Sequence, residues 1–344
     1  MSDLKTGIVY EKIFLEHDLP GHPENSKRLQ AIITELNESG LWDLTTKLIA
    51  RSAAIDELKL CHSEKYINHV KKICEDGGGY LDADTYTSEY SYEAAVIAVG
   101  GLIDLVKQVI DGKLKNGFAL LRPPGHHALS SRSMGFCLFG NVAIAAKAVL
   151  QSSKIDKVAI VDIDVHHGNG TQALVEDDPN ILYVSTHQFP FYPGSGSIKE
   201  IGKGESKNTL INVPLPALVS DDGFKEVYKE IILPKIEKFK PDLLIISAGY
   251  DAHWDDPLAN MGLNLSGYFW ISQQLNDIAT KLCRSKIVFA LEGGYHLRVL
   301  STGVANSIRV LLGLKDFNDS LSKSPFTEPD ISYLIKELKI IHQL

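Results

Sequence analysis

The sequence predicts an α/β protein, a single domain built on an open and mainly parallel sheet with helices on both faces. Short apolar runs alternate with longer segments of helical periodicity, which is typical of strands that alternate with helices. The runs are apolar at consecutive positions, as expected of strands covered by helices on each side. No repeat, low-complexity segment or long linker interrupts this alternation, so residues 1–344 are expected to form one domain.

The individual elements follow from the same two patterns. The apolar runs predict strands at residues 118–121, 158–161, 181–185, 243–247 and 287–291. Helical spacing between and after them predicts helices near residues 92–109, 141–151, 223–239, 266–283 and 299–312. A last helical segment at 328–344 has apolar residues three and four positions apart, and we expect this stripe to pack back onto the domain.

Composition narrows the class of protein. A formal net charge of −8 argues against direct nucleic-acid binding and is compatible with cationic substrates such as lysine-rich tails or polyamines. The longest apolar region, residues 94–109, contains Gly100, Gly101 and Asp104 and does not resemble a membrane span. The first residues lack a signal-peptide pattern, and the four cysteines lie far apart without a Cys-x-x-Cys pair, so a reducing cytoplasm is the expected location.

Each predicted strand is followed at once by polar or glycine-rich sequence. In open parallel sheets ligands bind outside the carboxyl ends of the strands, so these segments are expected to meet at one crevice. The five segments contain, in order, His126 and His127; Asp162 to Gly170; Thr186 to Gly194; Asp251 and His253; and Glu292 to Tyr295.

Asp164 and His166 are candidate metal ligands. Two positions apart in an extended chain, their side chains would leave the same face and offer an oxygen and a nitrogen to one divalent ion. Asp251 is the expected third ligand, which leaves a fourth position open as in catalytic zinc sites. A polar strand end, and a turn or capping role for Asp251, are the alternatives. His167, His187 and His253 are expected to serve packing or local hydrogen bonds instead.

His126 and His127 are candidate bases, because an imidazole titrates near neutrality and can activate water. Each needs a partner that fixes its tautomer, and Asp162 and Asn169 are available for this role. The Tyr295 phenol, which follows two glycines, could donate a hydrogen bond to an oxyanion. A histidine pair without a task and a core-edge tyrosine are the alternatives. Gly135, Phe136 and Tyr192 are expected to wall a narrow channel, with ordinary packing as their alternative.

These motifs, in this order, resemble the histone deacetylase family of the arginase/deacetylase superfamily, in its class II-like and prokaryotic branch. The resemblance runs from about residue 22 to about residue 313. It rests on RPPGHHA at 122–128, GFC at 135–137, DIDVHHGNG at 162–170, SAGYDAH at 247–253 and EGGY at 292–295. It implies a parallel sheet of about eight strands, more than the apolar runs alone predict.

The resemblance also implies roles for individual residues. Asp164, His166 and Asp251 match the ligands of one Zn²⁺; His126 and His127 match the paired histidines, buttressed by Asp162 and Asn169; and Tyr295 matches the tyrosine that polarises the carbonyl. Phe136 and Tyr192 match the aromatics that line the acyl-lysine tunnel, the second of which is commonly Phe. Asp84 matches a rim carboxylate and Arg28 an internal arginine. Leu258 falls where polyamine-preferring members can carry a glutamate. A K⁺ ion is expected near the zinc site, with side-chain ligands from Asp162 and Ser185 and carbonyls from Asp164, His166 and Thr186.

The expected reaction is zinc-dependent hydrolysis of an acetyl or related acyl group from lysine in a protein or peptide, with release of acetate. His127 is the expected general base. The alternatives are an acetylpolyamine amidohydrolase, an arginase-like enzyme with two manganese ions, and a silent metal-binding scaffold. The sequence leaves open the natural substrate, the acyl-chain preference and the oligomeric state.

Overall fold

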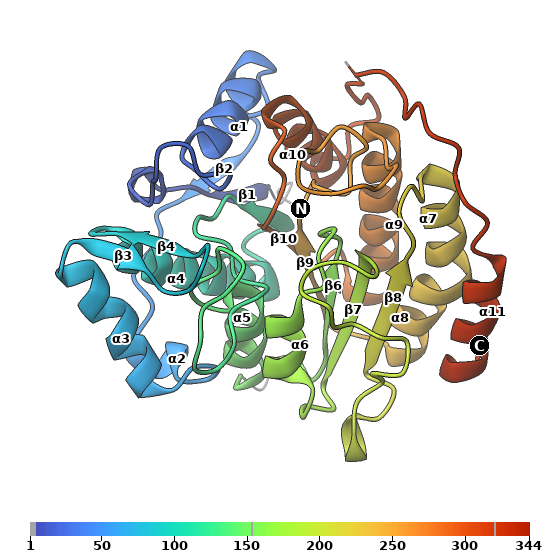
Figure 1. Ribbon diagram of the computed structural model, residues 1–344, viewed down its shortest axis with the longest axis horizontal. Helices are drawn as coiled ribbons and strands as arrows, with labels where there is room; N and C mark the ends of the chain where they lie inside the picture. Colours follow the sequence, from blue (N-terminus) through green and yellow to red (C-terminus); the bar gives the residue numbers. More distant parts are fainter. Residues whose placement is uncertain (1–4, 153, 320) are drawn as a thin grey trace.

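A parallel sheet forms the centre of the computed structural model, which describes residues 5–152, 154–319 and 321–344 (Figure 1). Within these residues eight strands form the sheet in the order β2-β1-β5-β10-β9-β6-β7-β8, and all neighbouring strands are parallel. The parallel α/β prediction is therefore confirmed. The strands are β1 Thr6–Val9, β2 Thr46–Leu48, β5 Asn116–Ala119, β6 Val158–Asp162, β7 Ile181–Gln188, β8 Leu210–Leu215, β9 Leu243–Ala248 and β10 Ile287–Leu291.

Helices cover both faces of the sheet (Figure 1). Crossovers between parallel strands are right-handed, so a helix that connects one strand to a later strand in one direction along the sheet lies on the opposite face from a helix that connects strands in the other direction. The contacts between helices agree with this assignment. One layer contains α3 Glu64–Glu75, α4 Ser91–Ile110, α5 Asn141–Leu150 and α6 Asn169–Val175. The other contains α1 Lys27–Glu38, α7 Asp221–Val227, α8 Leu233–Phe239, α9 Leu265–Cys283 and α10 Leu297–Leu312. Every residue of β6, β7, β9 and β10 is buried between the layers.

Three further parts of the chain, two helices and one hairpin, lie outside these layers. The short helix α2 Ile55–Leu58 precedes α3, and the antiparallel hairpin of β3 Gly78–Tyr80 and β4 Tyr86–Ser88 carries Asp84 on its connection. The C-terminal helix α11 Ser332–His342 lies within the predicted segment 328–344 and buries Ile335 and Leu338. Within the described residues, no helix combines the length and apolar character needed to cross a bilayer.

Several element boundaries differ from the sequence prediction. The ladder of β5 is 116–119 rather than 118–121, because Leu120 and Leu121 are buried beyond the strand and extend the apolar run. β7 continues to Gln188, so Thr186 and His187 lie inside the strand and do not follow it. The helix predicted at 223–239 is α7 and α8, joined by a π-helical turn at Tyr228–Ile232.

Candidate active site

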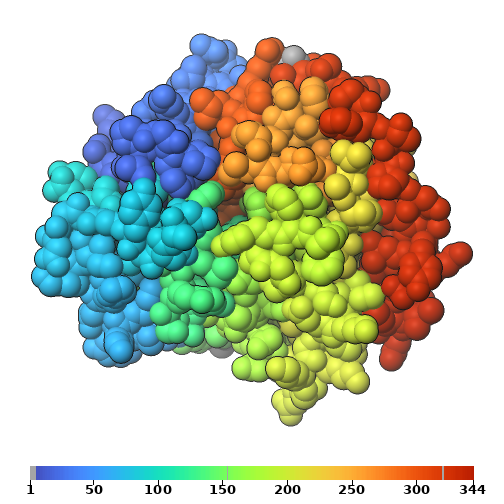
Figure 2. Space-filling model, in the orientation of Figure 1, coloured from blue at the N-terminus to red at the C-terminus, as the bar shows by residue number. Residues whose placement is uncertain are grey.

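The segments that follow the carboxyl ends of the strands converge on one edge of the sheet, as predicted. In Figure 2, parts of the chain that are far apart in sequence, coloured from blue through green to orange, meet around a hollow near the centre of the visible face. A cavity of about 200 Å³ is lined by residues of these segments: Asp84, His127, Gly135, Phe136, His166, Phe191, Tyr192, Leu258 and Tyr295. The five predicted channel and rim residues therefore border one space.

Asp164, His166 and Asp251 form a compact group beside this cavity. Each offers a ligand atom, and these atoms lie within 4.8 Å of one another. His166 Nδ1 lies 3.0 Å from Asp164 Oδ1 and 3.4 Å from Asp251 Oδ2. Asp164 and Asp251 are fully buried, and Asp251 Oδ2 has no hydrogen-bond partner among the described residues. A buried carboxylate oxygen without a partner is costly unless a cation neutralises it, so this group fits a metal ion.

The backbone around this group is not the extended chain that the sequence predicted. β6 ends at Asp162, and residues 164–166 form a bend from which both side chains point to the same place. The Gly-Asn-Gly segment that follows contains the start of α6, at Asn169. The side chains of Asp164 and His166 meet as expected, but because of this bend. The bend is held by the carboxylates of Asp162 and Asp164, which accept hydrogen bonds from backbone N–H groups.

The remaining carboxylate oxygens are fixed by backbone donors. The N–H of Val165 donates to Asp251 Oδ1 at 2.9 Å, and the N–H of Gly293 donates to Asp164 Oδ2 at 2.8 Å. Gly293 also leaves necessary space, because a Cβ there would lie 2.1 Å from Asp251 Oδ2 and 2.5 Å from Asp164 Oδ2. The glycine of the EGGY segment thus allows both carboxylates to approach each other.

His126 and His127 have the two predicted partners. His126 Nδ1 lies 3.2 Å from Asp162 Oδ2, and His127 Nδ1 lies 2.7 Å from Asn169 Oδ1. Because a carbonyl oxygen can only accept, His127 Nδ1 must carry the proton, which leaves Nε2 with a free lone pair. His127 lines the cavity and its ring centroid is 6.0 Å from that of His166.

Burial and neighbouring charges separate the pKa values of the two histidines. Burial alone lowers the pKa of His126, but the carboxylates of Asp164 and Asp162 outweigh it and raise this pKa well above its ordinary value. Burial and the positive charges of His126 and His166 lower the pKa of His127 well below its ordinary value. The protein therefore favours a charged His126 beside a neutral His127.

Tyr295 enters the cavity from the segment after β10. Its backbone N–H donates to Asp256 Oδ2 at 2.7 Å, and the Arg28 guanidinium lies 5.1 Å from its ring centroid. Arg28 also donates to the carbonyl of Gly294 at 2.8 Å, so both residues fix the backbone that presents the phenol. Burial raises the pKa of Tyr295 well above its ordinary value, despite the opposing charge of Arg28, which keeps the hydroxyl protonated as a donor.

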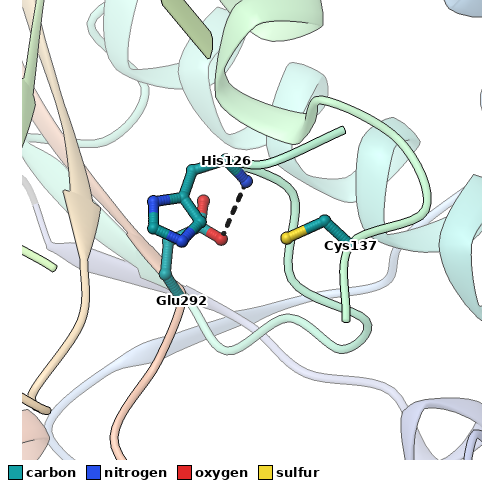
Figure 3. A group of neighbouring side chains, drawn as sticks. All are labelled: His126, Cys137 and Glu292. Carbon is teal, nitrogen blue, oxygen red and sulfur yellow. Dashed lines mark hydrogen bonds between the residues drawn. The ribbon is translucent and has the colours of Figure 1, made fainter. Parts of the chain in front are cut away.

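Glu292 is a supporting residue that sequence reasoning did not single out. Figure 3 shows its carboxylate directed at the backbone nitrogen of His126, with the Cys137 thiol pointing toward the same place. Glu292 Oε2 accepts from the N–H groups of Gly125 at 2.7 Å and His126 at 3.2 Å, and Oε1 accepts from Ser247 Oγ at 2.9 Å. This carboxylate therefore holds the loop that carries the histidine pair. Its place in the EGGY segment was the available signal.

The cluster of His126, Cys137 and Glu292 could be mistaken for a second metal site, since its ligand atoms also lie within 4.8 Å of one another. The Glu292 oxygens are already occupied, and the Cys137 thiol donates to the Gly135 carbonyl at 3.2 Å. Burial and the Glu292 carboxylate raise the pKa of Cys137 well above its ordinary value, which opposes the thiolate that a metal requires. The cluster is better explained as structural support.

The aromatic walls surround the two functional rings. Tyr192 meets the His127 ring edge-on, with centroids 5.2 Å apart, and Phe136 meets the Tyr295 ring edge-on at 5.9 Å. Phe191 was not predicted, yet it stacks on His166 at 5.6 Å. Asp84 is exposed at the rim.

The other histidines lie in separate hydrogen bonds. His167 contacts Ser195 Oγ and Gln172 Oε1, and His187 contacts Ser185 Oγ. His253 Nδ1 accepts the N–H of Asp255. None of the three belongs to the metal-ligand group found among the described residues.

Comparison with known proteins agrees with this geometry. The model of the histone deacetylase domain matches residues 22–311. The chain belongs to the histone deacetylase family. This histone deacetylase family member is 38% identical over 339 residues to histone deacetylase 14, chloroplastic, of Arabidopsis thaliana, covering 93% of this chain and 78% of that protein. It is 36% identical over 293 residues to a probable deacetylase of Archaeoglobus fulgidus, covering 84% and 81%.

The fold agrees as well. The crystal structure of the HDA15 HD domain superposes with a TM-score of 0.90 at 36% identity, covering 98% of this chain and 94% of that one. The predicted arginase/deacetylase fold is therefore confirmed, and family membership supports a hydrolytic deacetylase.

Proposed function

We propose that the protein is a zinc-dependent amidohydrolase that removes acetyl or related acyl groups from the side-chain amine of lysine in proteins or peptides, with release of acetate. The observation that carries this proposal is the meeting of a metal-ligand group, a base and an oxyanion donor at one cavity. The metal-ligand group of Asp164, His166 and Asp251 lies beside His127 and Tyr295, so a cation, a base and an oxyanion donor face one space.

The residues present suit zinc in particular. Two carboxylate oxygens and one imidazole nitrogen are ligands that zinc accepts, and three protein ligands are the number found in catalytic sites. Asp164, His166 and Asp251 would hold the ion, which supplies a Lewis acid that polarises the acyl carbonyl and acidifies water.

The two histidines have different roles, proton transfer for His127 and charge stabilisation for His126. His127 Nε2 takes a proton from the attacking water, because its Nδ1–H is committed to Asn169. His126 is held charged by Asp162 and stabilises the negative charge that develops. The amide C–N bond then breaks, and His127 returns its proton to the departing lysine amine.

Tyr295 stabilises the tetrahedral intermediate by donating its hydroxyl hydrogen to the oxyanion formed from the acyl carbonyl. Asp256 and Arg28 are positioning residues for this phenol, because Arg28 binds the carbonyl of Gly294 and Asp256 binds the N–H groups of Tyr295 and His296. Glu292 does the same for the histidine loop.

The cavity lining favours acyl-lysine over an acetylated polyamine. A polyamine carries further ammonium groups, which need carboxylates along the cavity. Of the lining residues that the structure describes, Asp84 is the one acid, and it is exposed at the rim. Leu258 gives the same wall an apolar surface. A lysine stem fits apolar walls, and Asp84 can accept hydrogen bonds from the backbone of a bound peptide.

The proposal also includes a K⁺ ion near the metal-ligand group and a reducing cellular compartment. Asp162 and Ser185 are direct partners in the register of β6 and β7, so both side chains can reach one K⁺ ion, joined by carbonyls from Asp164, His166 and Thr186. The four cysteines are free and buried, which suits a reducing compartment such as the cytoplasm.

A substrate panel tests this function. Zinc-loaded protein is assayed for acetate release from acetyl-lysine peptides, from peptides with longer acyl chains and from acetylated polyamines. We expect kcat/KM to be highest for a peptide substrate, and Leu258→Glu to shift the preference toward polyamines. A higher kcat/KM for the polyamine would make the alternative correct, and absence of turnover on every substrate would reject the enzyme proposal.

A further inference from the structure

A second cavity, of about 280 Å³, opens at the opposite edge of the sheet from the candidate active site. It lies beside the amino ends of β6, β7 and β8 and is closed by α8 and by the end of α11 (Figure 1). Four lysines border it: Lys157, Lys207, Lys235 and Lys238. None of the described residues that line it is acidic, although the whole chain has a formal net charge of −8. The cavity is therefore a local concentration of positive charge.

Lys235 is buried and forms no ion pair with the residues that the structure describes. It is 5% exposed, and its one hydrogen bond among the described residues is to the carbonyl of His342, at the long distance of 3.5 Å. Burial, together with the charge of Lys238, lowers the pKa of Lys235. A buried ammonium is unfavourable unless it is paired, so this position is better satisfied when an anion is present.

His342 is a second buried group without partners. It is 1% exposed, and neither ring nitrogen has a hydrogen-bond partner within the part of the chain that the structure describes. Burial and the neighbouring Lys235 charge lower the pKa of His342 to about 4. Buried polar groups in folded proteins almost always have partners. Among the described residues, His342 therefore has no side-chain hydrogen bond and Lys235 has only a long one, and both are potential donors at the same cavity.

We propose that this cavity binds a compact anion with linked phosphate groups, either free or as part of a nucleotide. Lys207 and Lys238 are exposed at its edge and would attract the anion, while Lys235 and His342 would bind it further inside. Lysine binds phosphate as a point charge. The three lysines Lys207, Lys235 and Lys238 carry more positive charge than a single carboxylate can neutralise, which favours a ligand with several negative charges. Lys157 is partly committed, since it donates to the Phe239 carbonyl at 3.3 Å and lies over that ring.

This binding site does not depend on the proposed deacetylase reaction, because it shares no residue with the cavity that His127 and Tyr295 border. Its C-terminal wall, α11, lies beyond the region matched by the histone deacetylase domain. The anion would join α11 to α8 through Lys235 and His342, so we expect binding to stabilise the protein against thermal unfolding.

Calorimetric titration of the full-length protein with pyrophosphate tests the proposal. The test variant Lys207→Gln/Lys238→Gln alters exposed side chains that do not endanger folding. Its control, Lys113→Gln/Lys115→Gln, makes the same change in net charge at exposed positions elsewhere. Because all three proteins keep the same candidate metal site, a difference between the variants cannot arise from pyrophosphate binding there. We expect the test variant to bind pyrophosphate about tenfold more weakly or worse, and the control to bind as the parent does.

His342→Gln gives an independent check of the inner part of the cavity, and it should also weaken binding while unliganded thermal stability is retained. Titrations with inorganic phosphate and ADP identify the source of the phosphate. Phosphate should bind more weakly than pyrophosphate, and ADP should match pyrophosphate if the natural ligand is a nucleotide. Equal pyrophosphate affinity in the test and control variants, or no binding to the parent protein, would overturn the proposal.

Discussion

Replacing Gly293 with alanine should destroy the metal site by adding one methyl group. The added Cβ would lie 2.1 Å from Asp251 Oδ2, and contacts under 3.0 Å require something to shift. That oxygen must therefore move by about 0.9 Å, several times the roughly 0.2 Å tolerance of metal–ligand distances. The alanine keeps the N–H that donates to Asp164, so the methyl is the only change at the site.

We expect zinc affinity to fall about 100-fold or more, the upper end of what loss of a supporting contact costs at such sites. Competition with a chromophoric chelator measures this affinity directly, without reference to turnover. Gly79→Ala is the matched control, since a Cβ there meets its nearest neighbour at an ordinary 3.8 Å. A zinc dissociation constant for Gly293→Ala within a few-fold of the parent would refute the reasoning.

Three further predictions concern catalysis and stability. Tyr295→Phe should lower kcat by about 100- to 1,000-fold, or about 2.7–4 kcal/mol, through loss of one oxyanion donor, and an unchanged kcat in steady-state assays would remove this phenol from the mechanism. His127→Ala should abolish turnover more completely than His126→Ala, because His127 has the free lone pair; near-normal kcat in His127→Ala would reverse the assignment. Burial lowers the pKa of His62 to about 4, so the unfolded chain takes up a proton below about pH 6.5 that the native protein refuses. The free energy of unfolding should therefore decrease as the pH is lowered from about 6.5 to about 4. In urea unfolding, His62→Gln should reduce the slope of this free energy against pH by about 1.4 kcal/mol per pH unit, and an unaltered slope would contradict the assignment.

The central strands could be predicted from sequence because they are apolar on both faces, as in the runs that became β6, β9 and β10. The strands β1, β2 and β8 were missed; β1 has only four residues, and β2 and β8 lie at the edges of the sheet. β8 includes Asn212 and Pro214, and β2 is three residues long with an exposed Lys47. Edge strands need less apolar surface, so hydrophobic pattern alone does not reveal them.

In the candidate site, the residues that carry the chemistry could be predicted from the sequence, whereas the residues that position them could not. Side chains whose chemistry is distinctive, such as Asp164, His166 and Asp251, could be singled out before their geometry was known. Glu292 and Asp256 could not, because they act through backbone N–H groups that lie far away in sequence. Such contacts depend on the folded path of the chain and leave little pattern in the residues themselves.

Zinc titration of metal-stripped protein tests the central claim most directly. Deacetylation of an acetyl-lysine peptide should rise linearly with added zinc and stop rising at one equivalent per chain, and Asp251→Asn should show neither tight zinc binding nor turnover. Full activity in the stripped protein, a requirement for two equivalents, or normal turnover in Asp251→Asn would contradict the account.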